Sequence, residues 1–195
     1  VRQQDLVAVT ECICRKEQKL LGKECDRPKE TCLGFGKFAR FYLDNKLGRS
    51  ITLDEAMKIL DLAEESGLVL SPSNAQELQF VCCCCSCCCP TLRAAKVVPK
   101  SKYVISSYYQ AKIDPDLCSD CGLCIERCQV EALKKGDGRS EIRDEKCIGC
   151  GLCISTCPEE AISLIARPGM GDPPKDFGET LLKIGTERRT LQSRS

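Results

Sequence analysis

The clearest alternation of hydrophobic and polar positions lies between residues 52 and 67. Apolar residues recur there at helical spacing, which predicts an amphipathic helix with a packing face of Leu53, Ala56, Met57, Leu60 and Ala63. Thr52 and Glu55 form a capping box at its start, and Gly67 predicts its end. The opposite face is acidic and would repel phosphates, so we interpret the segment as a packing helix and not a nucleic-acid recognition helix.

Weaker patterns divide the rest of the chain. Residues 68–70 predict a short extended piece, residues 108–113 a strand, and residues 177–187 a short helix in an otherwise irregular tail. We therefore expect a mainly helical, cysteine-rich N-terminal domain and a smaller C-terminal domain. The predicted boundaries are 1–98, a linker with first strand at 99–112, a second domain at 103–167 and a tail at 168–195.

Cysteine dominates the composition, at 19 of 195 residues, whereas histidine and tryptophan are absent. The lack of imidazole excludes Ser-His-Asp and Cys-His catalysis, histidine-ligated zinc and Rieske-type clusters. The 29 basic and 28 acidic residues nearly cancel. Net charge therefore gives no reason to expect a nucleic-acid partner.

Dense cysteine indicates either a disulfide scaffold or thiolates that bind metal. The count is odd and several cysteines are consecutive, which fits disulfides poorly. Residues 1–10 show no secretory signal, and no apolar stretch reaches the length of a membrane span. We expect a cytoplasmic, reduced protein whose cysteines bind metal. Because the chain begins with Val and not Met, we also expect a fragment or a processed form.

A duplicated motif carries the strongest chemical signal. Residues 113–133 and 142–162 align at an offset of 29, with 10 of 21 positions identical. Each copy reads Cys-x2-Cys-x2-Cys-x3-Cys, a spacing that binds [4Fe–4S] clusters, with the fourth cysteine at the start of a helix and ligating the cluster of the other copy. The expected ligand sets are Cys118, Cys121, Cys124 and Cys157 for cluster 1, and Cys147, Cys150, Cys153 and Cys128 for cluster 2.

On these motifs, residues 103–167 resemble a dicluster bacterial-type ferredoxin domain. The resemblance implies an α+β fold with two short hairpins and two short helices around the clusters. It also implies low-potential one-electron transfer, near about −400 mV, to a redox partner protein. The family usually has proline after the fourth cysteine; Pro158 matches this pattern, but Gln129 follows Cys128.

Eleven further cysteines lie in the first ninety residues. Sulfur-only ligands favour an additional iron–sulfur cluster, with a four-cysteine zinc site or buried packing residues as alternatives. Nearby Arg15, Arg93 and Lys96 are expected to stabilise thiolate charge. The candidate ligands of this third centre are a subset of Cys12, Cys14, Cys25, Cys32, Cys82, Cys83, Cys84, Cys85, Cys87, Cys88 and Cys89.

The whole chain also resembles uncharacterised iron–sulfur proteins of anaerobic bacteria. This resemblance rests on Cys-Ile-Cys-Arg at 12–15, Cys-Leu-Gly-Phe at 32–35, Ser-Asn-Ala-Gln-Glu at 73–77 and the cysteine run at 82–89. Our leading hypothesis is an electron-transfer protein or subunit, and the first alternative is an oxidoreductase with a catalytic N-terminal cluster for thiol or disulfide substrates. The second is a redox- or metal-sensing regulator, for which the sequence lacks a basic recognition helix.

Overall fold

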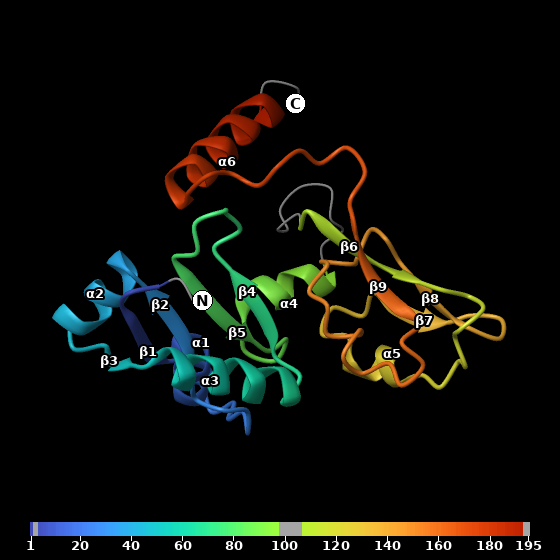
Figure 1. Cartoon of the computed structure of the whole chain (residues 1–195), viewed down its shortest axis with the longest axis horizontal. Helices are drawn as coiled ribbons and strands as arrows, with labels where there is room; N and C mark the ends of the chain where they lie inside the picture. The colour runs from blue at the N-terminus through green and yellow to red at the C-terminus, as the bar shows by residue number, and fades with distance from the viewer. Residues whose placement is uncertain (2–3, 98–106, 193–195) are drawn as a thin grey trace.

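The computed structural model describes residue 1, residues 4–97 and residues 107–192 (Figure 1). The N-terminal half is built on a five-stranded sheet in the order β3-β1-β2-β5-β4, and every neighbouring pair is antiparallel. Its elements are β1 (Val7–Glu11), α1 (Ile13–Leu20), β2 (Glu30–Phe35), α2 (Lys37–Asp44), β3 (Gly48–Ile51), α3 (Leu53–Glu65), β4 (Val69–Pro72), β5 (Phe80–Cys84) and α4 (Pro90–Val97).

The central sheet corrects the expectation of a mainly helical N-terminal domain. Its strands are only four to six residues long, so each offers few alternating positions from which to recognise it. Strand β5 also includes the first three cysteines of the run, for which the sequence predicts metal ligands or buried packing residues but no strand. In the structure, Cys83 faces the apolar core whereas Cys82 and Cys84 face the other side, as strand alternation requires.

One face of the sheet packs against α3, as the amphipathic pattern predicts. The core there joins Val9, Leu33 and Phe35 of the sheet to Ala56 and Leu60 of the helix. The predicted capping box is partly confirmed, because the Thr52 hydroxyl accepts a hydrogen bond of 3.1 Å from the Glu55 backbone N–H. This apolar layer holds the strands that carry the cysteines.

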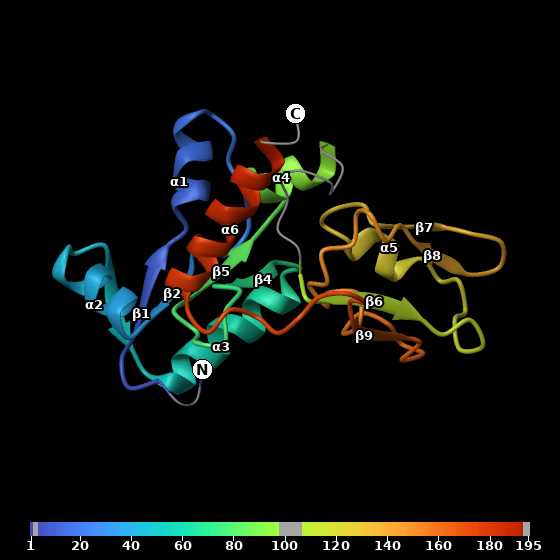
Figure 2. The ribbon, with the colours of Figure 1, turned by 90° about the horizontal axis from the view of Figure 1, so that it is seen from above.

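Helix α2 packs against the opposite face. Helix α6 (Phe177–Gln192) crosses above the strands (Figure 2) and reaches this face through Phe177 in its first turn. Phe38 of α2, Phe80 of β5 and Phe177 of α6 form an aromatic cluster with ring centroids 5.4 to 6.2 Å apart. Helix α6 begins where the sequence predicts it but continues past residue 187. The cluster fixes its first turn to the sheet.

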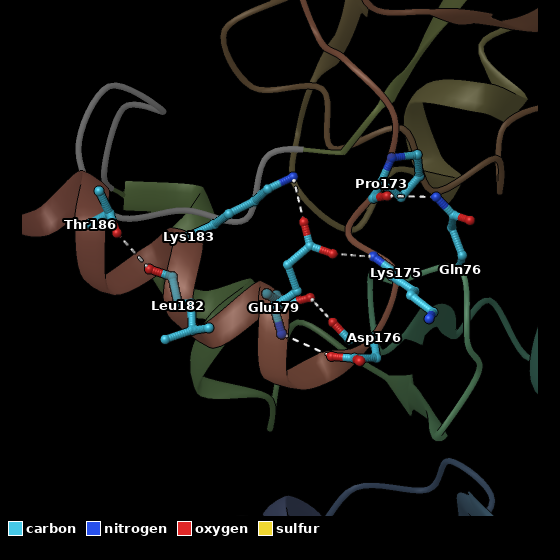
Figure 3. A network of polar contacts seen from close by, with 9 residues as sticks. Gln76, Pro173, Lys175, Asp176, Glu179, Leu182, Lys183 and Thr186 are labelled. Carbon is cyan, nitrogen blue, oxygen red and sulfur yellow. Dashed lines mark hydrogen bonds and ion pairs between the residues drawn. The ribbon is translucent and has the colours of Figure 1, made fainter.

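The tail is anchored by the loop between β4 and β5. The backbone N–H groups of Gln76 and Glu77 donate to the carbonyls of Pro174 and Lys175 at 2.8 and 2.9 Å. Figure 3 shows the adjoining start of α6, where the Asp176 carboxylate accepts from the Glu179 N–H at 2.9 Å. The segment at 73–77 that contributes to the whole-chain resemblance therefore holds the tail in place.

The C-terminal half has β6 (Tyr109–Ile113), α5 (Leu123–Arg127), β7 (Leu133–Lys135), β8 (Ser140–Ile142) and β9 (Ile162–Ala166). Strand β6 precedes the first motif and pairs with β9 after the second, whereas β7 and β8 pair between the motifs. This crossed pairing is the pseudo-twofold arrangement expected of the repeat. The predicted strand at 108–113 is confirmed as β6, but most of the predicted linker and the boundary at residue 98 lie outside the described residues.

Two details of the motif prediction are wrong. Helix α5 contains the third cysteine, Cys124, and is capped at its C-terminus by the fourth, Cys128, which therefore does not begin a helix. The corresponding part of the second copy, residues 152–156, forms turns in place of the expected second helix.

Candidate metal centres

Two cysteine-lined cavities occupy the C-terminal half. One is lined by Cys128 together with Cys147, Cys150 and Cys153. The other is lined by Cys157 together with Cys118, Cys121 and Cys124. Each cavity thus receives three cysteines from one copy of the motif and the fourth from the other copy, in the same groups as the expected ligand sets.

The two copies share the turn that follows the second cysteine. Gly122 and Gly151 both have a positive φ, of 82° and 81°, and the N–H three residues later donates to each of their carbonyls at 2.9 Å. Gly149 also has a positive φ, and a Cβ there would lie 2.1 Å from the Tyr109 carbonyl oxygen. Glycine is therefore required at Gly149. The first three cysteines of each copy, which surround these turns, line one cavity.

The donor set of both cavities fits iron–sulfur clusters. All eight donors are sulfur, the remaining walls are mostly apolar, and backbone N–H groups reach the thiols. The Ala132 N–H donates to Cys128 Sγ at 3.2 Å and the Ala111 N–H to Cys147 Sγ at 3.5 Å. Burial raises the pKa of Cys150 to about 11 and that of Cys153 to about 12. Cluster assembly must therefore displace protons from these thiols.

The two cavities differ at positions related by the repeat. Val130 lines the first cavity where Glu159 lines the second, and Ala111 lines the first where Ser140 lines the second. The Cys124 thiol donates to the Ser140 hydroxyl at 3.5 Å. Because Cys121 is exposed, the second cavity is also the one whose cysteine set includes a solvent-facing member. The pair is therefore chemically asymmetric.

In the N-terminal half, six cysteines form a continuous row of thiols across one end of the sheet. Cys32 of β2 lies directly opposite Cys82 of β5 in the strand register. Cys82 also contacts Cys84, and Cys84 contacts Cys89 at the start of α4. We call the set the thiol row, and its members are Cys12, Cys14, Cys32, Cys82, Cys84 and Cys89.

Contacts within the thiol row polarise its members. The contact with Cys32 lowers the pKa of Cys12 to about 6 and that of Cys82 to about 3. The contact with Cys84 likewise lowers the pKa of Cys89 to about 6. The pKa values of Cys32 and Cys84 are raised by the same contacts and by burial. Between Cys12 and Cys89, thiols whose pKa is lowered therefore alternate with thiols whose pKa is raised.

Four other cysteines make a compact group at the edge of the core. Their Sγ atoms all lie within 4.8 Å of one another, and no other set of three or more cysteine, aspartate or glutamate side chains in the described chain is as compact. We call this set the thiol quartet; it comprises Cys25, Cys85, Cys87 and Cys88. The remaining cysteine of the eleven, Cys83, is fully buried in the apolar core and joins neither set.

Arg15 lies between the thiol row and the thiol quartet. Its guanidinium is buried and donates to the Thr31 hydroxyl at 2.7 Å and to the Cys83 carbonyl at 2.8 Å. Burial tends to lower the pKa of Arg15, but Cys12 of the row and Cys85 of the quartet outweigh burial and raise it. Lys96, another cation that the sequence suggested as a partner of the thiolates, forms an ion pair of 3.1 Å with Glu131.

Residues beside Cys128 connect the two halves. The Arg127 guanidinium donates to the carbonyls of Glu64 and Glu65 at the C-terminus of α3. The Gln129 side chain donates a hydrogen bond to the Gly67 carbonyl and accepts one from the backbone N–H of Ser86, which lies within the cysteine run. Sequence reasoning missed both roles, although the glutamine in place of the usual proline was the available signal.

Comparison with known proteins identifies the C-terminal segment. No curated protein matches the chain. Residues 111–164 match the family model described as a 4Fe-4S dicluster domain, and this range contains all eight cysteines of the two cavities. Together with the cysteine content, the match supports iron–sulfur electron transfer. Residues 111–164 of this chain are a 4Fe–4S dicluster domain of the ferredoxin type.

Proposed function

We propose that this chain is an electron-transfer protein or subunit that relays single low-potential electrons through two [4Fe–4S] clusters. The main support is that each cavity is lined by four cysteines, enough to ligate every iron of one cubane. Cys118, Cys121, Cys124 and Cys157 would hold one cluster, and Cys128, Cys147, Cys150 and Cys153 the other. When bound, such clusters exchange one electron without binding substrate.

The asymmetry of the cavities supports different roles for the two proposed clusters: one faces solvent and the other adjoins the N-terminal half. Exposed Cys121 and Glu159 place one cavity toward solvent, where a redox partner protein can approach. Cys128 of the other cavity adjoins Gln129, which is bonded to the N-terminal half. The described helices include none long and apolar enough to cross a membrane.

We further propose that the thiol row binds an additional iron–sulfur cluster. The row offers six sulfurs, and no three of them are compact enough for a single ion, so a polynuclear centre suits their spread. Cys84 and Cys89 of the row pack in the same apolar cluster as Cys128 and Cys150 of the dicluster domain. The proposed third centre would therefore lie next to the cavity that contains Cys128 and Cys150, with closely packed side chains between them.

Anaerobic iron and acid-labile sulfide analysis of the full chain tests the third centre. Two cubanes account for about eight irons and about eight sulfides per chain, so the proposal requires more of both. The Cys32→Ala and Cys82→Ala substitutions together should remove only the excess, leaving the dicluster EPR signals intact. Cys83→Ala is the matched control, because Cys83 belongs to the same run but faces the core. If the wild-type protein contains no iron and sulfide beyond the content of two cubanes, the third centre is rejected.

An oxidoreductase is the second candidate function, because the row holds more sulfurs than the four that a cubane uses. Surplus thiols beside a cluster could serve two-electron reduction of a disulfide. Turnover of a small disulfide by the reduced protein, lost in the double variant and kept in Cys83→Ala, would favour this function. Electron transfer to acceptor proteins without such turnover would favour the relay.

A further inference from the structure

We propose that the thiol quartet binds one thiophilic divalent ion, zinc or iron, as a mononuclear tetrathiolate site. A metal–sulfur bond of about 2.3 Å in a regular tetrahedron separates two sulfurs by about 3.8 Å. Cys25 Sγ lies 3.5 Å from Cys87 Sγ and 3.9 Å from Cys85 Sγ, and the Sγ atoms of Cys87 and Cys88 are 3.8 Å apart. These separations match a single central ion.

The same distances argue against a cubane at the quartet. A cubane bonds its four thiolates to four different irons and therefore spreads their sulfurs well beyond 4.8 Å, the limit within which all four Sγ atoms lie here. The local chain supports a compact site. After β5 the backbone turns, with the N–H of Cys88 and of Cys89 donating to the Cys85 carbonyl, so that Cys85, Cys87 and Cys88 converge.

Buried charge near the quartet provides an independent observation. Arg15 is 6% exposed, its Nε has no hydrogen-bond partner, and it forms no ion pair with a carboxylate among the described residues. An unbalanced buried guanidinium is costly. A divalent ion with four thiolates carries two net negative charges, and its ligand Cys85 is one of the thiols that act on Arg15. The proposed site therefore places negative charge beside this cation, in addition to Cys12 of the thiol row.

A metal at the quartet would act as a cross-link between distant segments. Cys25 lies in the loop between α1 and β2, 60 positions before Cys85. Ser86, inside the quartet turn, is the residue that Gln129 holds. The ion would thus fix the end of the cysteine run beside the dicluster domain, as structural tetrathiolate sites do. This inference does not depend on the proposed electron transfer.

The first test uses the full-length wild-type protein, purified anaerobically. Metal analysis should find about one zinc per chain, with zinc-edge X-ray absorption showing four sulfur neighbours at about 2.3 Å. Mononuclear iron would give instead, after mild oxidation, the high-spin ferric EPR signal of a tetrathiolate iron. Either result supports the site and identifies its ion. Absence of both species would overturn the proposal without affecting the dicluster assignment.

A second test uses cysteine variants to show whether the thiol quartet holds the ion. Cys87→Ser, at the exposed member of the quartet, and Cys25→Ser should each lose the mononuclear ion while the sulfide content stays unchanged. Ser86→Ala is the matched control within the turn, because it keeps the backbone N–H that donates a hydrogen bond to the Gln129 side chain. If a quartet variant fails to fold, cobalt(II) added to the metal-depleted wild type should show tetrahedral thiolate absorption. Loss of sulfide together with the ion, or retention of the ion in both variants, would contradict the proposal.

Discussion

The backbone N–H of Ser86 donates a hydrogen bond of 3.0 Å to the side-chain oxygen of Gln129. The amide nitrogen of Gln129 in turn donates to the Gly67 carbonyl, also at 3.0 Å. Gln129 follows Cys128, where the family usually has proline, and a proline could form neither bond. One side chain therefore joins a cysteine of the dicluster cavity to the turn between Cys85 and Cys87.

Replacing this glutamine should loosen the contact between the halves. Gln129→Leu leaves the half-buried Ser86 N–H and the Gly67 carbonyl without their partner, at a cost of about 1 to 3 kcal/mol. Hydrogen exchange of the peptide around Ser86 should accelerate by roughly tenfold, which corresponds to about 1.4 kcal/mol. Gln110→Leu, at a half-buried glutamine of β6, is the control and should leave this peptide unchanged. Equal exchange in both variants would show that the bond is unimportant.

Crossed ligation predicts a specific pairing of spectral changes. Cys128→Ser should alter the same EPR features of the reduced protein as Cys150→Ser, because both line one cavity. Cys157→Ser should alter the same features as Cys121→Ser. If Cys128→Ser matched Cys121→Ser, a residue of its own motif copy, each loop would hold its cluster alone.

The carboxylate at one cavity should lower the potential of that cluster. Reduction adds negative charge, so Glu159→Gln removes a repulsion and should raise this potential by about 10 to 40 mV, limited by solvent screening. Glu160→Gln is the matched control, because this neighbouring exposed carboxylate does not line the cavity. An EPR-monitored redox titration measures both. A shift of the same size in the two variants would indicate a general surface-charge effect.

Arg15 should contribute far more stability than its neighbour on the same helix. Arg15→Gln leaves Thr31 and the Cys83 carbonyl short of donors inside the protein, so we expect a loss of about 2 to 4 kcal/mol. Lys16→Gln breaks an exposed, solvent-screened pair with Glu11 and should change stability little. Anaerobic urea denaturation of both variants compares them. Similar midpoints would mean that the buried cation is not balanced by the thiols around it.

The features predicted correctly from the sequence are local ones. Helix α3 follows from its own periodicity and cap, and the dicluster domain at 111–164 follows from cysteine spacing repeated at a fixed offset. The division of the other cysteines is not local. It depends on the register that places Cys32 opposite Cys82 and on the loop that returns Cys25 to Cys85. Because the strands were not recognised, neither juxtaposition could be predicted.

EPR of the anaerobic full chain, with iron and sulfide counted on the same sample, tests the central claim most directly. Two neighbouring [4Fe–4S] clusters held by the dicluster domain predict about eight irons and about eight sulfides from this domain alone. They also predict reduced-state signals that broaden by spin–spin coupling as the second cluster takes up its electron. A protein with about half that iron, or with one uncoupled signal at full reduction, would contradict a two-cluster relay.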